Sequence, residues 1–262
     1  MTEPIRPPTK EITAACDAID RVIELFISAR ETLPGSQYEA DVEALTLFNL
    51  VIRHIEGVLV LARNDMVLIP PAYACARAAF ETGIKAAWMV NSDDPFVRET
   101  RWLAHLAEEG RVYLRVAART EDQESSASFG ARAQAIQQFR QGVIERLPSH
   151  IKLLPGNPNL EEMSRAIGGE RLYSLYIFLS QFIHGGHAAT NLYRKNLGTE
   201  KKFGEFVVPG NWYIAFRLCW LSLSHPGNIV LSQLSGTSTR YISSDEEARV
   251  VAAIQATNIG SE

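Results

Sequence analysis

Apolar residues recur at intervals of three and four along most of the chain, which is the pattern of amphipathic helices. The first such stretch begins near Thr9 and continues for about two dozen residues, with its apolar side chains on one face. Pro34-Gly35 ends it with a turn signal. The second stretch, residues 42–63, is apolar on almost every side, which predicts a central rather than a surface helix.

Proline, glycine and short polar runs divide the remainder of the chain into further helical stretches. Pro71 and Pro95 each suit the first turn of a helix, where a backbone N–H is not needed. The run His225-Pro226-Gly227 is expected to kink or divide the last large helix. The further helical stretches are residues 66–90, 101–119, 131–147, 160–168, 173–193, 212–224 and 245–256.

These elements predict an all-α fold, a multi-helix bundle of about eight to nine helices. Residues 203–208, FGEFVV, are expected to form a short β-hairpin or an extended flap. Residues 1–8 are polar and proline-rich and are expected to be a flexible tail, followed by a single helical domain over 9–262. The polar residues near 120–130 are expected to be a flexible connector, and the more polar helix after them surface-exposed or partner-facing.

The composition, with 46% hydrophobic and 21% charged residues, is that of a globular protein. A net charge of −4 argues against broad electrostatic binding of nucleic acid, while leaving room for a local basic patch. The N-terminus lacks an apolar signal region, and no stretch holds the roughly 20 uninterrupted apolar residues of a spanning helix. We therefore expect a cytoplasmic protein without a membrane segment.

Known sequence signatures of catalysis are missing from the chain. There is no glycine-rich phosphate loop, nucleophile elbow or paired-cysteine zinc pattern. The three cysteines, Cys16, Cys75 and Cys219, lie far apart in apolar stretches, so reduced core residues are expected and no cofactor is predicted.

The candidate chemistry consists of polar residues inside apolar helices, which usually come in sets because each costs about 1–3 kcal/mol without a partner. Arg77 and Glu81 stand four residues apart, as do Tyr176, Ser180 and His184 in another helix. We expect Arg77 and Glu81 to meet Ser180 and His184 across a helix pair, with Glu81 orienting the imidazole and Arg77 supplying fixed positive charge. Such a cluster suits a phosphate or carboxylate, or acid–base chemistry at neutral pH.

Two alternatives remain open for these residues. Arg77 and Glu81 would form an exposed helical ion pair worth about 0.3–0.5 kcal/mol, or a structural network. His184 and His187, separated by Gly185-Gly186, would hold a metal ion together with a ligand from another helix. The further ligands considered for such a site are His54, Glu56 and Glu81.

Basic and aromatic residues follow this helix. Tyr193, Arg194 and Lys195 would form a mouth suited to a phosphate-bearing ligand. The alternative is that these cations simply stabilise the C-terminal end of the helix.

Two segments, ARAAFETGIKAAWMV and YSLYIFLSQFIHGG, together resemble an uncharacterised family of bacterial helical proteins over roughly residues 40–235. In that family an Arg-x-x-x-Glu helix is paired with a Tyr/Ser/His helix. The residues that carry the resemblance are Arg77, Phe80, Glu81, Tyr176, Ser180 and His184.

That family is in turn similar to the HEPN helical domains, many of which are ribonucleases of toxin–antitoxin, CRISPR-associated and antiphage systems. The resemblance implies a homodimer that cuts RNA without a metal ion. The HEPN signature is an arginine followed by four to six residues and then a histidine on one helix. Arg101–His105 and Arg146–His150 are each one residue too short, so Arg77 would have to replace that arginine from another helix.

The expected function is therefore a helical effector of a bacterial defence or toxin-type system that acts on RNA or a phosphate-bearing ligand, with metal-independent ribonuclease as the enzymatic form. A homodimer or larger assembly is expected. The alternatives are a non-catalytic interaction protein with a structural cluster, and a metal-dependent enzyme in a helical bundle. The expected catalytic residues are Arg77, Glu81 and His184, and the expected ligand-binding residues are Tyr176, Ser180, His187, Tyr193 and Arg194.

Overall fold

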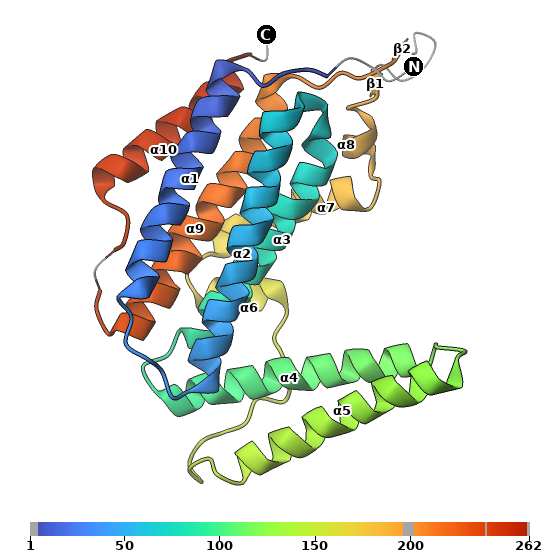
Figure 1. Cartoon of the computed structure of the whole chain (residues 1–262), viewed down its shortest axis with the longest axis vertical. Coiled ribbons are helices and arrows are strands. Elements are labelled where there is room, and N and C mark those ends of the chain that lie inside the picture. The colour runs from blue at the N-terminus through green and yellow to red at the C-terminus, as the bar shows by residue number, and fades with distance from the viewer. Residues whose placement is uncertain (1–4, 196–201, 239, 261–262) are drawn as a thin grey trace.

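A computed structural model describes residues 5–195, 202–238 and 240–260 of the chain (Figure 1). The architecture is an all-α multi-helix bundle, which confirms the predicted fold class. Its helices are α1 Lys10–Glu31, α2 Glu39–Asn64, α3 Ile69–Val90, α4 Pro95–Ala117, α5 Gln123–Ile144, α6 Leu160–Ala166, α7 Tyr173–Ile183, α8 His187–Thr190, α9 Trp212–Ser235 and α10 Ser244–Ala256. Short 3₁₀ turns occupy Met66–Leu68, Glu170–Leu172, Pro209–Asn211 and Thr257–Gly260.

Side-chain caps fix where several helices begin. Thr9 accepts a hydrogen bond from the backbone N–H of Ile12 and caps α1 at the predicted position. Asp94 caps α4 in the same way, and Asn159 forms a capping box with Glu162 at the start of α6. Each such cap supplies an acceptor for an otherwise unpaired N–H and is worth about 1 kcal/mol.

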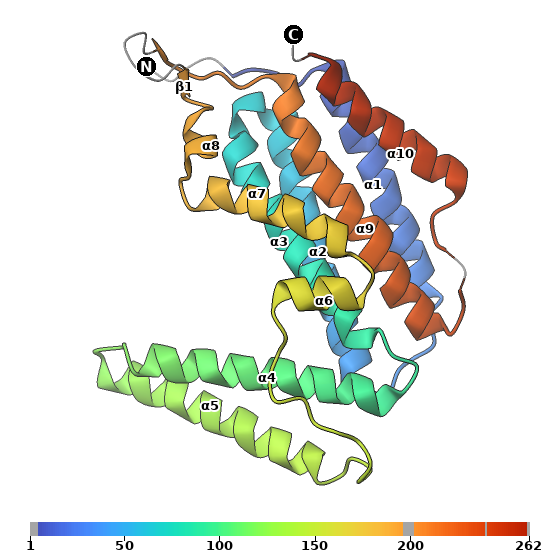
Figure 2. The ribbon, with the colours of Figure 1, turned by 180° about the vertical axis from the view of Figure 1, so that it is seen from behind.

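Four helices form the centre of the bundle. In Figure 1, α1, α2, α3 and α9 run beside one another, and α10 packs outside α1 and α9. Seen from behind in Figure 2, α7 crosses over α3. The core is rich in aromatic rings, and Phe26 stacks on Phe48 with 4.2 Å between centroids. The largest fully buried side chains include Trp212, Tyr73, Phe26, Phe48, Phe80 and Phe216.

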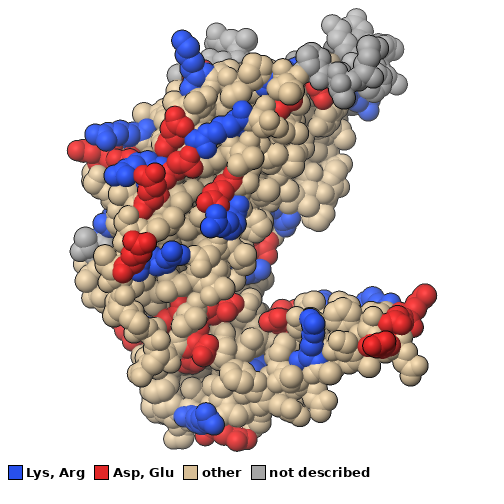
Figure 3. Space-filling model, viewed as in Figure 1, with Lys and Arg blue, Asp and Glu red and all other residues tan. Residues whose placement is uncertain are grey.

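Helices α4 and α5 form an arm that projects away from the bundle (Figures 1 and 3). Within α5 only Ala133 is buried, which agrees with the expected exposed helix. The expected connector at 120–130 is wrong, however, because Asp122 caps a helix that already begins at Gln123. Its polar residues form the exposed first turns of α5.

The expected division of the last large helix is also wrong. Helix α9 continues from Trp212 to Ser235 with Pro226 inside it. Pro226 is buried, and it packs so closely on Gly83 that a Cβ there would lie 3.5 Å from the proline Cβ. Its burial and this contact with α3 keep the helix continuous, although proline lacks the N–H of one helical hydrogen bond.

Helix α2 is central but not surrounded. A stripe that includes Val42, Leu50 and Val60 faces solvent, with these side chains 48%, 49% and 65% exposed. By length and apolar composition α2 could cross a membrane, and it is the one helix among the described residues that could. Of its most apolar 18-residue window, 44% is buried inside the bundle.

Two boundaries differ from the sequence analysis near the candidate site. The expected helix 173–193 ends at Ile183, because Gly185 adopts a left-handed conformation with φ +64°. The expected hairpin lies earlier than 203–208, since Arg194 pairs with Phe203 and Lys195 with Lys202. These two-residue strands are β1 Arg194–Lys195 and β2 Lys202–Phe203.

Candidate functional site

The candidate site lies where α7 crosses α3. Leu179 of α7 is fully buried, and Phe182 packs on the Tyr73 ring of α3 with 4.3 Å between centroids. These apolar contacts place Tyr176, two turns before the end of α7, over the middle of α3. The crossing therefore brings together polar residues that are about a hundred positions apart in the chain.

Tyr176 joins Arg77 to Glu81. Nη2 of Arg77 donates to the Tyr176 hydroxyl at 2.7 Å, and the hydroxyl donates to Oε2 of Glu81 at 3.3 Å. The Arg77 guanidinium carbon also lies 4.5 Å from the centroid of the tyrosine ring, within reach of a cation–π interaction. Arg77 and Glu81 were expected to meet Ser180 and His184 of α7, and they meet Tyr176 of the same helix instead.

Lys85 is a fourth member of the cluster, which the sequence analysis missed. Its Nζ donates to Oε1 of Glu81 at 2.7 Å, with the side chains of Lys85 and Glu81 35% and 33% exposed. The signal was present, because Lys85 follows Glu81 by four residues and so lies on the same helical face. The four residues Arg77, Glu81, Lys85 and Tyr176 are called the α3–α7 cluster below.

The charges of the α3–α7 cluster do not cancel. Burial acts to raise the pKa of Glu81, but the hydrogen bond and charge of Lys85, the charge of Arg77 and the hydrogen bond from Tyr176 outweigh it, so that pKa lies below its usual value. Glu81 is therefore ionised at neutral pH. Two cations face one carboxylate, which leaves one positive charge in excess.

Arg77 also retains an unused donor. Its Nε is buried and has no hydrogen-bond partner among the residues that the structure describes. A buried donor without a partner costs about 1–3 kcal/mol, so a bound oxygen atom at this position would be favourable.

Ser180 and His184 do not join this network. Ser180 donates back to the carbonyl of Tyr176 at 3.0 Å, within its own helix. His184 is the exposed C-cap of α7, and no hydrogen bond or ion pair joins it to Glu81 in the described part of the chain. The reason is geometric: four residues turn a helix about 40° past a full turn, and eight turn it about 80°, so His184 has rotated away from the face that Tyr176 presents to α3.

His187 begins α8 and is exposed. It follows Gly186, where an added Cβ would lie 3.0 Å from the carbonyl oxygen of Gln181, so the turn needs glycine. Over the described ranges, no three His, Cys, Asp or Glu side chains are grouped as metal ligands. The geometry thus provides no ligand set for the alternative in which His184 and His187 bind a metal with His54 or a carboxylate.

Tyr193 and Arg194 lie farther along, at the start of the β1–β2 pairing. Tyr193 is 44% exposed, and burial together with the nearby Glu205 carboxylate raises its pKa. Nε of Arg194 is buried and, like that of Arg77, has no hydrogen-bond partner among the described residues. The side chain of Lys195 lies outside the described residues.

His105 of α4 lies at the other end of the α3–α7 cluster. Burial and the charge of Lys85 lower the pKa of its imidazole. Its Nε2 lies 3.9 Å from Oε1 of Glu43 on α2. Lys85 therefore connects the cluster electrostatically to the base of the α4–α5 arm.

A comparison with protein families gives one match: a model described as a family of unknown function, DUF5677, covers residues 42–202. The searches of curated proteins and of solved structures found no match. The matched span contains the whole α3–α7 cluster as well as His184, His187 and Arg194.

Proposed function

The chain belongs to the DUF5677 family, and we propose that it is a helical effector that binds RNA or another phosphate-bearing ligand at the α3–α7 cluster. In this proposal it acts in the cytoplasm as a homodimer or larger assembly, in a bacterial defence or toxin-type system. The resemblance to HEPN domains supports RNA as the ligand class.

The observation that carries the proposal is the unused binding capacity of Arg77. Its guanidinium is held in place by Tyr176, keeps a buried Nε without a partner in the described chain, and belongs to a cluster with one excess positive charge. Because this nitrogen is buried, the guanidinium would turn toward the ligand on binding, and a phosphate oxygen would then satisfy the Nε donor and balance that charge. Guanidinium groups are well suited to this, because their rigid fork of donors matches phosphate geometry.

The surface charge agrees with a local rather than a broad phosphate site. On the face drawn in Figure 3, basic and acidic side chains are interspersed over the bundle and the arm. A ligand would therefore be recognised by a few placed groups, and its binding would weaken only modestly with salt.

His184 has the acid–base role in this proposal. It is exposed at the end of α7, eight residues after Tyr176, and an imidazole can both accept and donate a proton. For RNA, it would remove the proton of a 2′-hydroxyl as that oxygen attacks the neighbouring phosphorus, and His187 would protonate the departing 5′-oxygen. The products would be a cyclic phosphate and a free 5′-hydroxyl.

A structural role is the second candidate, and a different observation favours it. The Tyr176 hydroxyl is hydrogen-bonded on both sides, so the cluster also fastens α7 to α3. A protein that only binds a partner through its surface would need this network for rigidity alone.

The test is an RNA cleavage assay combined with growth after induction. We expect wild type to degrade RNA and slow growth, and His184→Ala and Arg77→Gln to lose both effects while remaining folded. The matched controls are His150→Ala, at another exposed histidine, and Arg53→Gln, at an exposed arginine of α2 paired with Glu56. If wild type and His184→Ala are equally inactive and RNA binding is unchanged by Arg77→Gln, the structural role is correct.

A further inference from the structure

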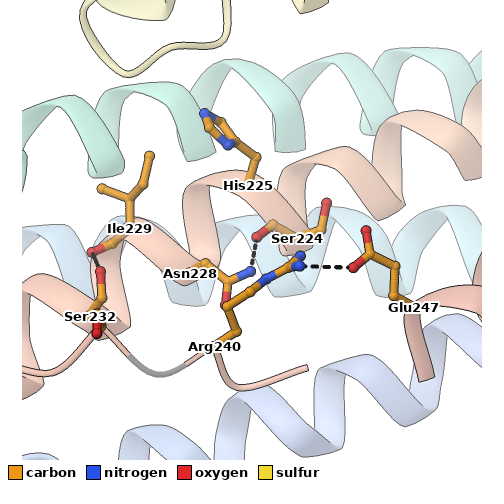
Figure 4. A pocket seen from close by; sticks show the side chains of 8 residues that line it. Ser224, His225, Asn228, Ile229, Ser232, Arg240 and Glu247 are labelled. Carbon is orange, nitrogen blue, oxygen red and sulfur yellow. Dashed lines mark hydrogen bonds and ion pairs between the residues drawn. The ribbon is translucent and has the colours of Figure 1, made fainter. Parts of the chain in front are cut away.

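A second candidate site lies on the other side of the bundle, between α9, α10 and the segment that joins them. The cavity there has a volume of about 470 Å³, within the range of roughly 300–1,000 Å³ typical of small-molecule sites. Figure 4 shows the side chains that line it. It lies outside the span of the family match and contains no residue of the α3–α7 cluster.

Its floor is a polar stripe on a core helix. Ser224, Asn228 and Ser232 follow one another at four-residue intervals on α9, a helix whose other lining residues include apolar Ile229. Ser224 is buried. Buried hydroxyl and amide groups are normally hydrogen-bonded. We therefore expect the polar side chains of this stripe to have partners.

Asn228 explains part of the stripe by holding the cavity wall in place. Its Nδ2 donates to the Ser224 carbonyl, and its Oδ1 accepts from the backbone N–H of Tyr241 at 3.2 Å. The Tyr241 hydroxyl in turn donates to the carbonyl of Leu223 at 2.8 Å. The wall that carries Arg240 is therefore fixed to α9 before any ligand arrives.

An ion pair stands at the mouth of the cavity. Nη1 of Arg240 lies 3.0 Å from Oε2 of Glu247, which comes from α10, and their side chains are 52% and 37% exposed. Figure 4 shows the two charged groups directed toward each other beside Asn228. A pair this exposed is held weakly, so a ligand that offers a partner to each charge can replace it.

We propose that this cavity binds a small zwitterion of the amino-acid class. The carboxylate of the ligand would accept two parallel hydrogen bonds from the Arg240 guanidinium, and its ammonium would donate to the Glu247 carboxylate. The second Nδ2–H of Asn228 and the hydroxyl oxygen of Ser232, which the wall does not use, would contact the remaining polar atoms of the ligand. The charges of the lining sum to zero when His225 is neutral, which favours a ligand without net charge over a free anion.

His225 has no part in this recognition. Its Nε2 lies 2.7 Å from the carbonyl of Ile167, and in Figure 4 the ring points away from Arg240 and Asn228. It joins α9 to the end of α6 and so supports the fold beside the cavity.

The test is ligand-observed NMR with glycine and L-alanine as zwitterionic probes, and glucose and inorganic phosphate as comparison probes. We expect both amino acids to bind wild type at millimolar concentration and to bind Arg240→Gln and Glu247→Gln at least about tenfold more weakly. The matched control is Arg249→Gln, which breaks the ion pair between the exposed Arg249 and the partly buried Glu246 of the same helix; neither residue lines the cavity, and binding should be unchanged.

Three results would overturn the proposal: binding of glucose or phosphate without either amino acid, equal weakening by Arg249→Gln, or no binding of any probe by wild type at these concentrations. Circular dichroism of each variant separates a lost site from a lost fold. The outcome is independent of the RNA assay, because no residue is shared between the two sites.

Discussion

The Arg77 guanidinium lies over the ring of Tyr176 and also donates a hydrogen bond to its hydroxyl, so both the ring face and the hydroxyl of one tyrosine position the arginine. The hydroxyl passes the interaction on to Glu81. The contact therefore fixes both the position of α7 on α3 and the direction in which the guanidinium of Arg77 points.

Tyr176→Phe should separate these two contributions. The ring stays, but Arg77 and Glu81 each lose a hydrogen-bond partner, and we expect the free energy of unfolding to fall by about 1–2 kcal/mol. The measurement is urea denaturation. Tyr213→Phe is the matched control, because Tyr213 accepts a hydrogen bond from Arg217 in an exposed pair on α9 and should lose only a few tenths of a kcal/mol. Equal losses in the two variants would show that the cluster does not hold α7.

Glu81→Gln should change how stability depends on pH. The folded pKa of Glu81 lies below the ordinary glutamate value of 4.5, so the carboxylate contributes stability that is fully present above that value and lost as the pH falls through the folded pKa. The stability advantage of wild type over Glu81→Gln should therefore be constant near neutral pH and shrink in acid. A difference that stays constant down to the acid limit of folding would contradict this.

Thiol reactivity should follow burial. Burial raises the pKa of Cys16 to about 12, and it also raises the pKa of Cys219 and of the half-buried Cys75. Because thiolates react and thiols do not, we expect iodoacetamide at pH 8 to modify Cys75 slowly and the other two only in denaturant. Mass spectrometry of digests would locate the label. Rapid labelling of Cys16 in the native protein would show that α1 opens.

Two glycine-to-alanine changes should have opposite effects. A Cβ on Gly227 would lie 3.1 Å from both Phe48 Cζ and Tyr241 Oη, and we expect a loss of about 1–3 kcal/mol. Gly130 lies within α5 with no atom close to a Cβ, so alanine there should stabilise the protein by up to about 1 kcal/mol. Thermal unfolding of both variants gives the comparison. A neutral Gly227→Ala would mean that the core at Phe48 adjusts without strain.

The helices and much of the α3–α7 cluster were predictable because they depend on local periodicity. Thr9 caps α1 as expected, and the four-residue spacing correctly placed Arg77 and Glu81 on one face, although that face meets Tyr176 rather than the expected Ser180 and His184. The same reasoning failed for His184, since repeated four-residue steps rotate around a helix instead of following one face.

Other features depended on contacts that a single sequence does not display. Pro226 remains inside a helix because Gly83 and the surrounding core hold it, and the sequence alone indicated a break. The start of α5 was missed because its first residues are polar, although Asp122 is a good N-cap. The direction of the α4–α5 arm depends on the backbone dihedral angles of residues 91–94, and the periodicity of apolar residues does not predict these angles.

The α4–α5 arm also defines how the molecule can open. Helix α5 packs chiefly on α4, and its contribution to the core is small: Ala133 is its one buried residue, and Val143 and Ile144 in its last turn are partly buried against the core. The amide hydrogens of α5 should therefore exchange through a local opening that leaves the bundle intact, long before those of α3 or α9. The arm is in this sense a separate cooperative unit, and the turn at its tip is a natural place to insert a tag or a fluorophore without disturbing either site.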